Sequence, residues 1–544
     1  IMSQGMTTEL PLFKKGSWTL NFRQSNPVKK YSQIYTTIQK FLTGNDSFNL
    51  LTETANDENA QESDYLINSS YKDLISRFSF LFSPKQRVSV TYISGLDSII
   101  EDREYFGFNT ILGSDTNYIN EKTKLNHNGA VINWFSDWDI NFSSNFSISN
   151  YHNKSNYTSQ QSTTTYNNNL SSDNKIIDNN FFSERTIKYN QKYTGIKNHK
   201  IISGLEENYY NIKIQKNYLD DLTSNFFEFF QTGYIYSFYI NDQWKNSNQL
   251  MINSSIRISY NNIINSFYFD PRFSIKYKMS SSLILESSLG KHHQPLQYLS
   301  EQNTNTTQGV WVINSSQIPI TTSLNSHIGL IWERNNYNFS FMNYNRILDN
   351  LLYYEDLKPL IFNDDLENFN INIGKGFSRG SEILLRKKNG TTTGWITYHL
   401  NNTNYKFSNL NNGKEFSPEY EKRHEFKIVL VKNIYDTDLT ASWIYSSGGN
   451  YTNIKDLYVG SGYDIIVSDN KNNERLKSTH HLDISMNKNI QVAKFHIDTG
   501  LSIYNLYNNK NISHKRHNPY TQRISVKDIA MFGITPTFFI RISL

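Results

Sequence analysis

The chain has 544 residues, with 54 Lys and Arg against 49 Asp and Glu, which gives a formal charge of +5. This length exceeds one ordinary small domain, and the nearly neutral charge disfavours a nucleic-acid-binding protein. Only 37% of the residues are hydrophobic and the mean hydropathy is −0.59, which disfavours a conventional large enzyme, whereas an aromatic content of 15% excludes disorder along the whole chain.

The chain contains no cysteine, which excludes disulfides, Cys-ligated metal sites and a thiol nucleophile. It also has no run of about 18 or more apolar residues, so we expect no α-helix of this sequence to cross a bilayer. A β-barrel is then the remaining route through a membrane. The first five residues lack an initiator Met and the charged and apolar regions of a secretory signal, and we expect a mature or truncated product.

Apolar and polar side chains alternate along most of the sequence, which is the pattern of strands with one apolar face. Helical stripes with caps are almost absent, so the fold is expected to be all-β. In chain order, clear strands are residues 88–92, 256–260, 273–277, 439–445 and 495–503.

The end of the chain resembles the closing strand of an outer-membrane barrel. Phe538, Ile540, Ile542 and Leu544 alternate with other residues up to the last position. Such strands commonly end in an aromatic residue, and Leu544 departs from that pattern.

Two kinds of connection separate the predicted strands. Residues 83–86 and 279–282 form short turns, whereas the long polar connections are residues 44–63, 151–184, 300–323 and 446–475. Short turns that alternate with long loops are typical of outer-membrane barrels, whose turns are periplasmic and whose loops are extracellular. We therefore predict a large transmembrane antiparallel β-barrel of about 22 strands, which leaves roughly 25 residues for each strand and its connection.

Twelve different short segments, spread in order along nearly the whole chain, match motifs of one protein family. They are residues 9–18, 94–97, 128–131 with Trp134, 239–244, 270–272, Gly290 with 294–295, 344–351, 376–382, 394–398, 423–426, Arg475 with 480–485, and 503–508. In its order and spacing this series resembles the barrel portion of the TonB-dependent receptors of Bacteroidetes-type bacteria. Lys477 and Thr479 stand where that family often has Pro and Tyr.

The resemblance implies a gated importer of solutes too large or too scarce for porins. Its ligand would bind between the long loops and a plug domain, and an inner-membrane energy complex would act through that plug. From the resemblance we expect residues 1–544 to correspond to the barrel alone, without the plug, the short TonB-contact segment before it and the signal peptide. Energy-dependent transport is therefore expected only if a plug domain is part of the protein.

Some acidic and histidine residues could in principle bind a metal. A hard cation such as calcium could be ligated by two acidic groups, Asp220 with Asp221, and Asp364 and Asp365 with Glu367. The preferred interpretation is that these carboxylates are solvated charges in loops. The pairs His292–His293 and His480–His481 are not expected to chelate one ion, because neighbouring strand residues point to opposite faces.

Other polar residues allow two interpretations. If Leu482, Ile484, Phe495 and Ile497 face lipid, the lumen side of the same strands carries Asp483, Ser485, His496 and Asp498. In the lumen these polar side chains would contact the plug or a solute, or would form a polar ladder on the barrel wall. Gly374 with Gly376 and residues 447–449 lack the lysine of a phosphate-binding loop. The basic stretch 510–516 could attract anionic lipopolysaccharide or a partner, although a solvated loop is preferred.

The sequence thus predicts an outer-membrane receptor-like barrel of a Gram-negative bacterium that takes up a solute, and not an enzyme. It indicates no catalytic, cofactor or metal residue and leaves the ligand-binding residues unknown. Expected partners are outer-membrane lipids, lipopolysaccharide, a surface lipoprotein or other outer-membrane proteins, and the energy complex if a plug exists. The main alternative is a plug-less barrel that serves as a structural or docking subunit; a passive porin and a soluble adhesin are further alternatives.

Overall fold

The computed structural model describes residues 2–13, 15–26, 53–54, 65–109, 113–165, 171–219, 224–300, 309–354, 371–459, 464–468, 470–518 and 525–544. These residues are almost entirely in strands, as predicted, and their one helical element is the 3₁₀ turn η2 (Asn411–Gly413). Within these ranges, no helix has the length and apolar character needed to cross a membrane.

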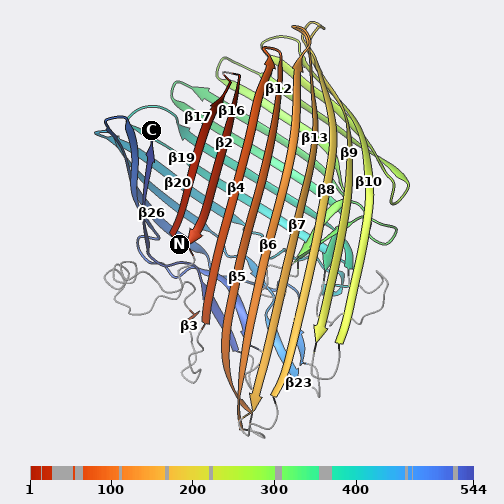
Figure 1. Ribbon diagram of the computed structural model, residues 1–544, viewed down its shortest axis with the longest axis vertical. Coiled ribbons are helices and arrows are strands. Elements are labelled where there is room, and N and C mark those ends of the chain that lie inside the picture. Colours follow the sequence, from red (N-terminus) through yellow and green to blue (C-terminus); the bar gives the residue numbers. More distant parts are fainter. Residues whose placement is uncertain are drawn as a thin grey trace.

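A 21-stranded antiparallel sheet dominates the molecule and curls into a barrel (Figure 1). Its strands follow one another in chain order: β1 (Met2–Leu12), β2 (Gly16–Asn26), β4 (Tyr65–Ser83), β5 (Gln86–Asn109), β6 (Gly113–Asp137), β7 (Phe142–Thr165), β8 (Ser171–Tyr193), β9 (His199–Leu219), β10 (Ser224–Lys245), β11 (Leu250–Asn261), β12 (Ser266–Lys278), β13 (Leu283–Gln294), β16 (Thr321–Arg334), β17 (Tyr337–Tyr354), β18 (Ile371–Lys387), β19 (Thr392–Phe407), β20 (His424–Ile434), β21 (Thr437–Ser446), β26 (Thr479–Val492), β27 (Phe495–Tyr504) and β30 (Thr535–Ser543).

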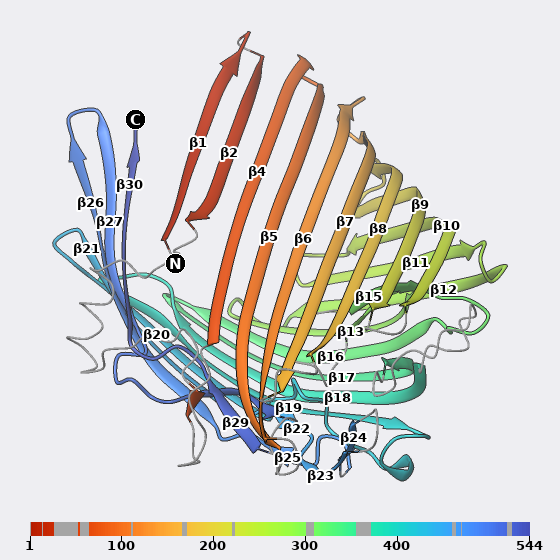
Figure 2. The ribbon, with the colours of Figure 1, turned by 60° about the horizontal axis from the view of Figure 1, so that its bottom comes forward.

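The strand number is close to the predicted 22. Because neighbouring strands alternate in direction, the first and the last of 21 strands run the same way. Consistent with this, β1 pairs only with β2, and β30 pairs only with β27, among the described strands. The edges of β1 and β30 face each other across the seam of the barrel (Figure 2).

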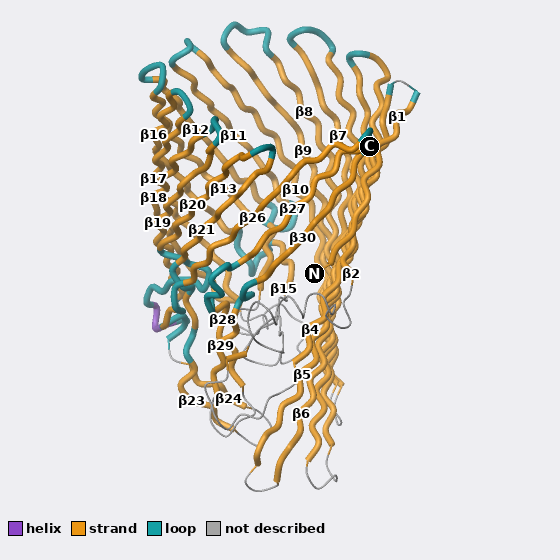
Figure 3. Tube along the Cα trace, turned by 90° about the vertical axis from the view of Figure 1, so that its left-hand side faces the viewer, coloured by secondary structure: helices purple, strands orange, loops and turns teal. Residues whose placement is uncertain are grey.

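The short turns gather on one rim, as predicted (Figure 3). Residues 83–86 join β4 to β5, and residues 279–282 join β12 to β13. Tyr435 and Asp436 form a two-residue turn between β20 and β21, and both have positive φ, at 46° and 60°. Two consecutive positive φ angles define a type I′ turn, whose twist matches that of the strands it joins.

The opposite rim carries the long connections, and four small hairpins or sheets form within them. These pair β14 (Leu296–Ser300) with β15 (Gly309–Ile313), β22 (Asn450–Tyr451) with β25 (Glu474–Arg475), β23 (Ile454–Val459) with β24 (Asp464–Ser468), and β28 (Ile512–Asn518) with β29 (Ser525–Ala530), which also pairs with β3 (Glu53–Thr54). Most of the predicted loop 44–63 lies outside the described residues.

The predicted long loop at residues 151–184 is wrong. Its described residues continue β7 and β8, and they pair with each other as far as Thr164 and Ser171. The backbone ladder continues there although most side chains on both faces are polar, because strand pairing needs no apolar face above the membrane. The strands β4 to β10 therefore extend beyond the rest of this rim (Figure 3).

The strands have one apolar and one polar face, as their alternation predicts. In β5, Val90 and Tyr92 are 37% and 42% exposed, whereas Ser89, which precedes Val90 and points to the other face, is buried. In β30, the exposed side chains include Phe538, Ile540 and Ile542. Exposed apolar side chains on the outer wall and buried polar ones on the inner wall are what a barrel in lipid requires.

Candidate functional site

The connection between β13 and β16 folds back into the barrel as a hairpin of β14 and β15 (Figure 2). We call residues 296–300 and 309–313 the lumen hairpin. Its apolar side chains form one buried cluster with residues from β8, β9 and β10: Leu299, Val312 and Ile313 of the hairpin, and Phe182, Tyr210, Ile212, Ile214, Phe227 and Ile235 of the wall. The side of β8 to β10 that bears these residues is therefore the side facing the lumen.

Four rings from the hairpin and the wall lie together near the mouth of the barrel. Trp311 stacks on Phe182 with ring centroids 4.9 Å apart and lies 5.1 Å from Tyr298, and Tyr151 lies 6.3 Å from Phe182. Tyr298 is 46% exposed, so this aromatic group offers an accessible ring. Aromatic surface with an accessible polar edge suits a ligand that itself carries rings.

Buried amides fix the lumen hairpin to the wall. The Gln231 side chain bonds both backbone groups of Ile313, since its Nε2 donates to the carbonyl and its Oε1 accepts from the amide, each at 3.2 Å. Asn261 Nδ2 donates to Asn314 Oδ1 at 2.8 Å, and both side chains are buried. Because the bonds reach the backbone of β15, the hairpin is held in one register.

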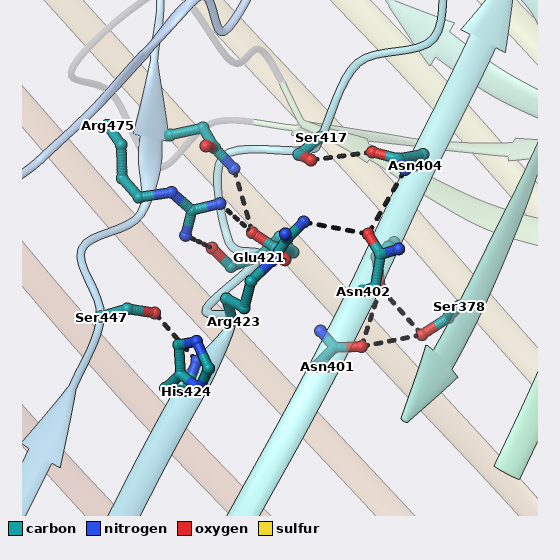
Figure 4. A network of polar contacts seen from close by, with 12 residues as sticks. Ser378, Asn401, Asn402, Asn404, Ser417, Glu421, Arg423, His424, Ser447 and Arg475 are labelled. Carbon is teal, nitrogen blue, oxygen red and sulfur yellow. Dashed lines mark hydrogen bonds and ion pairs between the residues drawn. The ribbon is translucent and has the colours of Figure 1, made fainter. Parts of the chain in front are cut away.

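A second polar network joins two loops at the same rim (Figure 4). Glu421 is fully buried, and its carboxylate lies 2.5 Å from Arg475 Nη2 and 3.7 Å from Arg423 Nε. Arg475 also donates to the Gly448 carbonyl at 2.9 Å, and Asn450 donates to the Pro418 carbonyl at 2.8 Å. We call Glu421, Arg423, Asn450 and Arg475 the loop clasp.

The loop clasp is anchored to the barrel wall as well as within the loops. Arg423 Nη2 donates to Asn402 Oδ1 of β19 at 3.2 Å, and the His424 amide donates to Ser447 Oγ at 3.1 Å. A Cβ on Gly448 would lie 1.8 Å from the Leu476 carbonyl oxygen, so the close approach of the two loop segments requires glycine there. The clasp therefore holds these loops to each other and to the barrel wall.

The model of the family described as TonB dependent receptor-like, beta-barrel matches residues 36–506 of the chain. The chain belongs to this family of TonB-dependent receptor barrels. No curated protein matches it in sequence.

Solved structures with the same fold include several receptors. The ferric-catecholate import receptor Fiu of Escherichia coli K12 has a TM-score of 0.61 at 11% identity, over 99% of this chain and 81% of that chain. The ferripyoverdine receptor of Pseudomonas aeruginosa has 0.60 at 8%, over 99% and 69%. The ferric preacinetobactin receptor BauA of Acinetobacter baumannii has 0.58 at 10%, over 99% and 78%.

Membership of the family places this receptor barrel in the outer membrane of a Gram-negative bacterium. The family and the similar structures are transport receptors and not enzymes. Nothing in the family description supports a docking subunit in place of a receptor.

The histidine pairs have separate partners. His293 Nδ1 lies 2.6 Å from Asp270 Oδ1, whereas His292 lies beside Gly290. His480 Nδ1 lies 2.7 Å from the Tyr507 hydroxyl, and His481 Nδ1 lies 2.9 Å from Asp483 Oδ1. In the described part of the chain, no three His, Asp or Glu residues form a group that could hold a metal ion. The candidates Asp220, Asp221, Asp364, Asp365 and Glu367 lie outside the described residues.

The predicted lumen residues of β26 and β27 share one face. Ser485 pairs with Ser502, and Asp498 pairs with Asn489, whereas the opposite face pairs Ile484 with Ile503 and Val492 with Phe495. Asp483 accepts a bond from the Asn505 amide at 2.9 Å, and Asp498 lies 3.9 Å from Arg541. A role of Asp483, Ser485, His496 and Asp498 in contacts with a solute or plug stays a prediction.

The basic stretch 510–516 is not simply a solvated loop. Residues from Ile512 form β28, and Lys515 lies 3.1 Å from Asp528 and 5.2 Å from the ring of Tyr451. Gly374 and Gly376 lie near the start of β18, where the Lys406 carbonyl approaches Gly374.

The loops beside the clasp contain two charged groups with shifted pKa values. Burial raises the pKa of the Glu419 carboxyl to about 7, and burial lowers the pKa of the Lys471 amine to about 8. The Lys471 ammonium lies 4.4 Å from the centre of the Tyr353 ring. Both shifts have one cause, the removal of the charged form from water.

Glu419 should make the stability of these loops depend on pH. Its pKa is higher in the folded loops than the ordinary value of 4.5, so the folded form holds more protons and the loops lose stability as pH rises from about 4.5 to about 7. The Asn450 amide, which donates to the Glu419 carbonyl at 3.1 Å, should exchange faster at pH 7 than at pH 5 after correction for intrinsic exchange. Glu419→Gln should remove this pH dependence, and an unchanged dependence would refute the assignment.

Proposed function

We propose that the receptor binds a ring-bearing solute, such as a ferric catecholate chelate, at the aromatic group and imports it across the outer membrane. The observation that carries the proposal is the lumen hairpin, which presents Trp311 and the exposed Tyr298 inside the mouth. The similar structures add support, because they include a ferric-catecholate import receptor and a ferripyoverdine receptor.

We further propose that residues 1–544 act as the barrel around a plug domain, and that the inner-membrane TonB complex drives transport through that plug. The segments that resemble Bacteroidetes-type receptors favour a host of that kind and a surface lipoprotein that delivers the solute. The intact mass of the protein from its native membrane tests the plug. A mass above 63.6 kDa by a domain of roughly 100 to 150 residues is expected, and a mass near 63.6 kDa would refute it.

Binding of ferric enterobactin to the purified receptor in detergent tests the ligand class. Saturable binding is expected, and Trp311→Ala and Tyr298→Ala should each weaken it by about threefold to tenfold, the range for loss of one aromatic contact. Tyr435→Ala is the matched control, because this ring is 92% exposed on the opposite rim. Absence of saturable binding, or equal affinity in all three variants, would refute the proposed ligand class.

A further inference from the structure

The outer face of the wall from β1 to β8 contains a continuous apolar row. Successive strand pairs bring Leu10, Trp18, Phe78, Val90, Ile132, Ile148 and Ile187 side by side. Phe182 and Ile212, on the other face of the same wall, pack on the lumen hairpin. The apolar row therefore faces the membrane.

Six residues further along and on the same face, three of the six positions that pair in a row are lysines. Lys72, Lys154 and Lys213 lie in one row across β4, β7 and β9, which the pairs Lys72–Leu96, Leu96–Asn126, Asn126–Lys154, Lys154–Phe181 and Phe181–Lys213 connect. Lys122 and Lys124 of β6 follow on the next positions of this face. This face is turned toward the viewer in Figure 1.

The height of the basic positions fits the outer boundary of the bilayer. Six residues at a rise of about 3.3 Å span roughly 20 Å along a strand, or about 15 Å in height at the tilt of outer-membrane strands. The apolar band of such barrels is about 25 Å tall. Phe181 lies between Lys154 and Lys213, and rings beside cationic side chains are typical of a membrane interface.

Lys122, Lys124 and Lys154 form a tight group of like charges. Lys122 and Lys124 are two apart on one face of β6, and Lys154 pairs with Asn126, the next residue of that face. The three ammonium groups have no ion pair among the described residues, whereas Lys213 lies 2.6 Å from Glu228. Neighbouring like charges on a sheet destabilise it unless an anion lies between them.

Among the residues whose side chains the structure describes, the acidic groups near this face form no ion pair with the three lysines. Asp102, diagonal to Lys122, accepts a hydrogen bond from the Tyr118 hydroxyl at 3.0 Å and another from Asn120. Glu207, further toward the other rim, lies 3.8 Å from Arg185. An anion from outside the chain is therefore the partner that this surface fits.

We propose that Lys122, Lys124 and Lys154 bind the phosphate groups of a phosphorylated glycolipid of the outer leaflet. Lysine binds phosphate as a compact point charge, and the apolar row below would contact the acyl chains of the same lipid. This interaction surface is independent of the solute proposed for the lumen, since the two lie on opposite faces of the wall.

Native mass spectrometry of the full receptor in detergent, with added lipid A, tests the proposal. The triple variant Lys122→Gln, Lys124→Gln, Lys154→Gln should bind lipid A about a hundredfold more weakly than the unaltered protein, since each lysine near an anionic surface contributes about fivefold. The same three positions changed to Arg should keep the binding. Lys85→Gln, Lys197→Gln, Lys278→Gln, which removes the same charge at the short-turn rim, should bind like the unaltered protein.

Two further probes separate a lipid site from a simple anion site. Dephosphorylated lipid A should bind as weakly to the unaltered protein as lipid A binds to the triple variant, and inorganic phosphate alone should not displace lipid A. Displacement by inorganic phosphate, equal binding of dephosphorylated lipid A, or equal loss in the short-turn control would overturn the proposal. Heat-dependent gel mobility shows that each variant forms a folded barrel.

Discussion

Arg475→Ala is expected to open the loop clasp. The change leaves the Glu421 carboxylate buried without its nearest cation, and removing one partner of a buried ion pair costs about 3 to 5 kcal/mol. The Leu476 amide, which donates to the Gly449 carbonyl at 2.8 Å, should therefore exchange at least about a hundredfold faster.

The matched control for the clasp is Arg541→Ala. Arg541 also faces a carboxylate, Asp498, but at 3.9 Å and with both side chains more than one third exposed. Exposed pairs contribute about 0 to 1 kcal/mol, so exchange at Leu476 should not change in this variant. An increase of less than tenfold in Arg475→Ala, or an equal increase in the control, would show that the clasp does not hold the loops.

The second large effect concerns the lumen hairpin, which Ile212→Ala combined with Gln231→Ala is expected to release. Loss of a buried Ile side chain costs about 2 to 5 kcal/mol, and the loss of Gln231 leaves the backbone of Ile313 without its two bonds. The chain has no cysteine, so a single Val312→Cys reports the release. Val312 is buried, and its maleimide labelling should rise at least about a hundredfold in the double variant.

The control for the hairpin is Ile148→Ala with Gln243→Ala in the same Val312→Cys background. Ile148 lies on the outer face, and Gln243 lies near the short-turn end of β10, so the same side-chain types are removed away from the hairpin. Labelling of Cys at 312 should stay slow in this control. Slow labelling in the Ile212 and Gln231 double variant would show that the hairpin does not depend on these contacts.

Period-two alternation predicted the strands because one face of each strand meets lipid, as in residues 88–92 and 538–544. The same reasoning failed at residues 151–184, where most side chains on both faces are polar and only the neighbouring strand reveals the pairing. Strand length beyond the bilayer depends on pairing with the neighbouring strand, which the alternation of side chains does not show.

The site was harder to predict than the fold, because its residues come together only through long-range contacts. Trp311 lies in a short apolar run, residues 309–313, that could have indicated a strand within the predicted loop 300–323. Glu421 lies two residues before the segment 423–426, which belongs to the family resemblance, as Arg475 does. The resemblance does not show that Arg423 and Arg475 both contact Glu421. No sequence pattern marks Gln231 as the partner of Ile313 across 82 positions.

The most direct measurement of the central claim is uptake of ferric enterobactin labelled with radioactive iron by cells that produce the full receptor as their only route for this chelate. The account predicts saturable uptake that stops when an uncoupler dissipates the proton gradient, and that falls in the Trp311→Ala, Tyr298→Ala double variant. Uptake that continues with the uncoupler and rises linearly with concentration would show a passive pore, and would contradict import by an energised receptor.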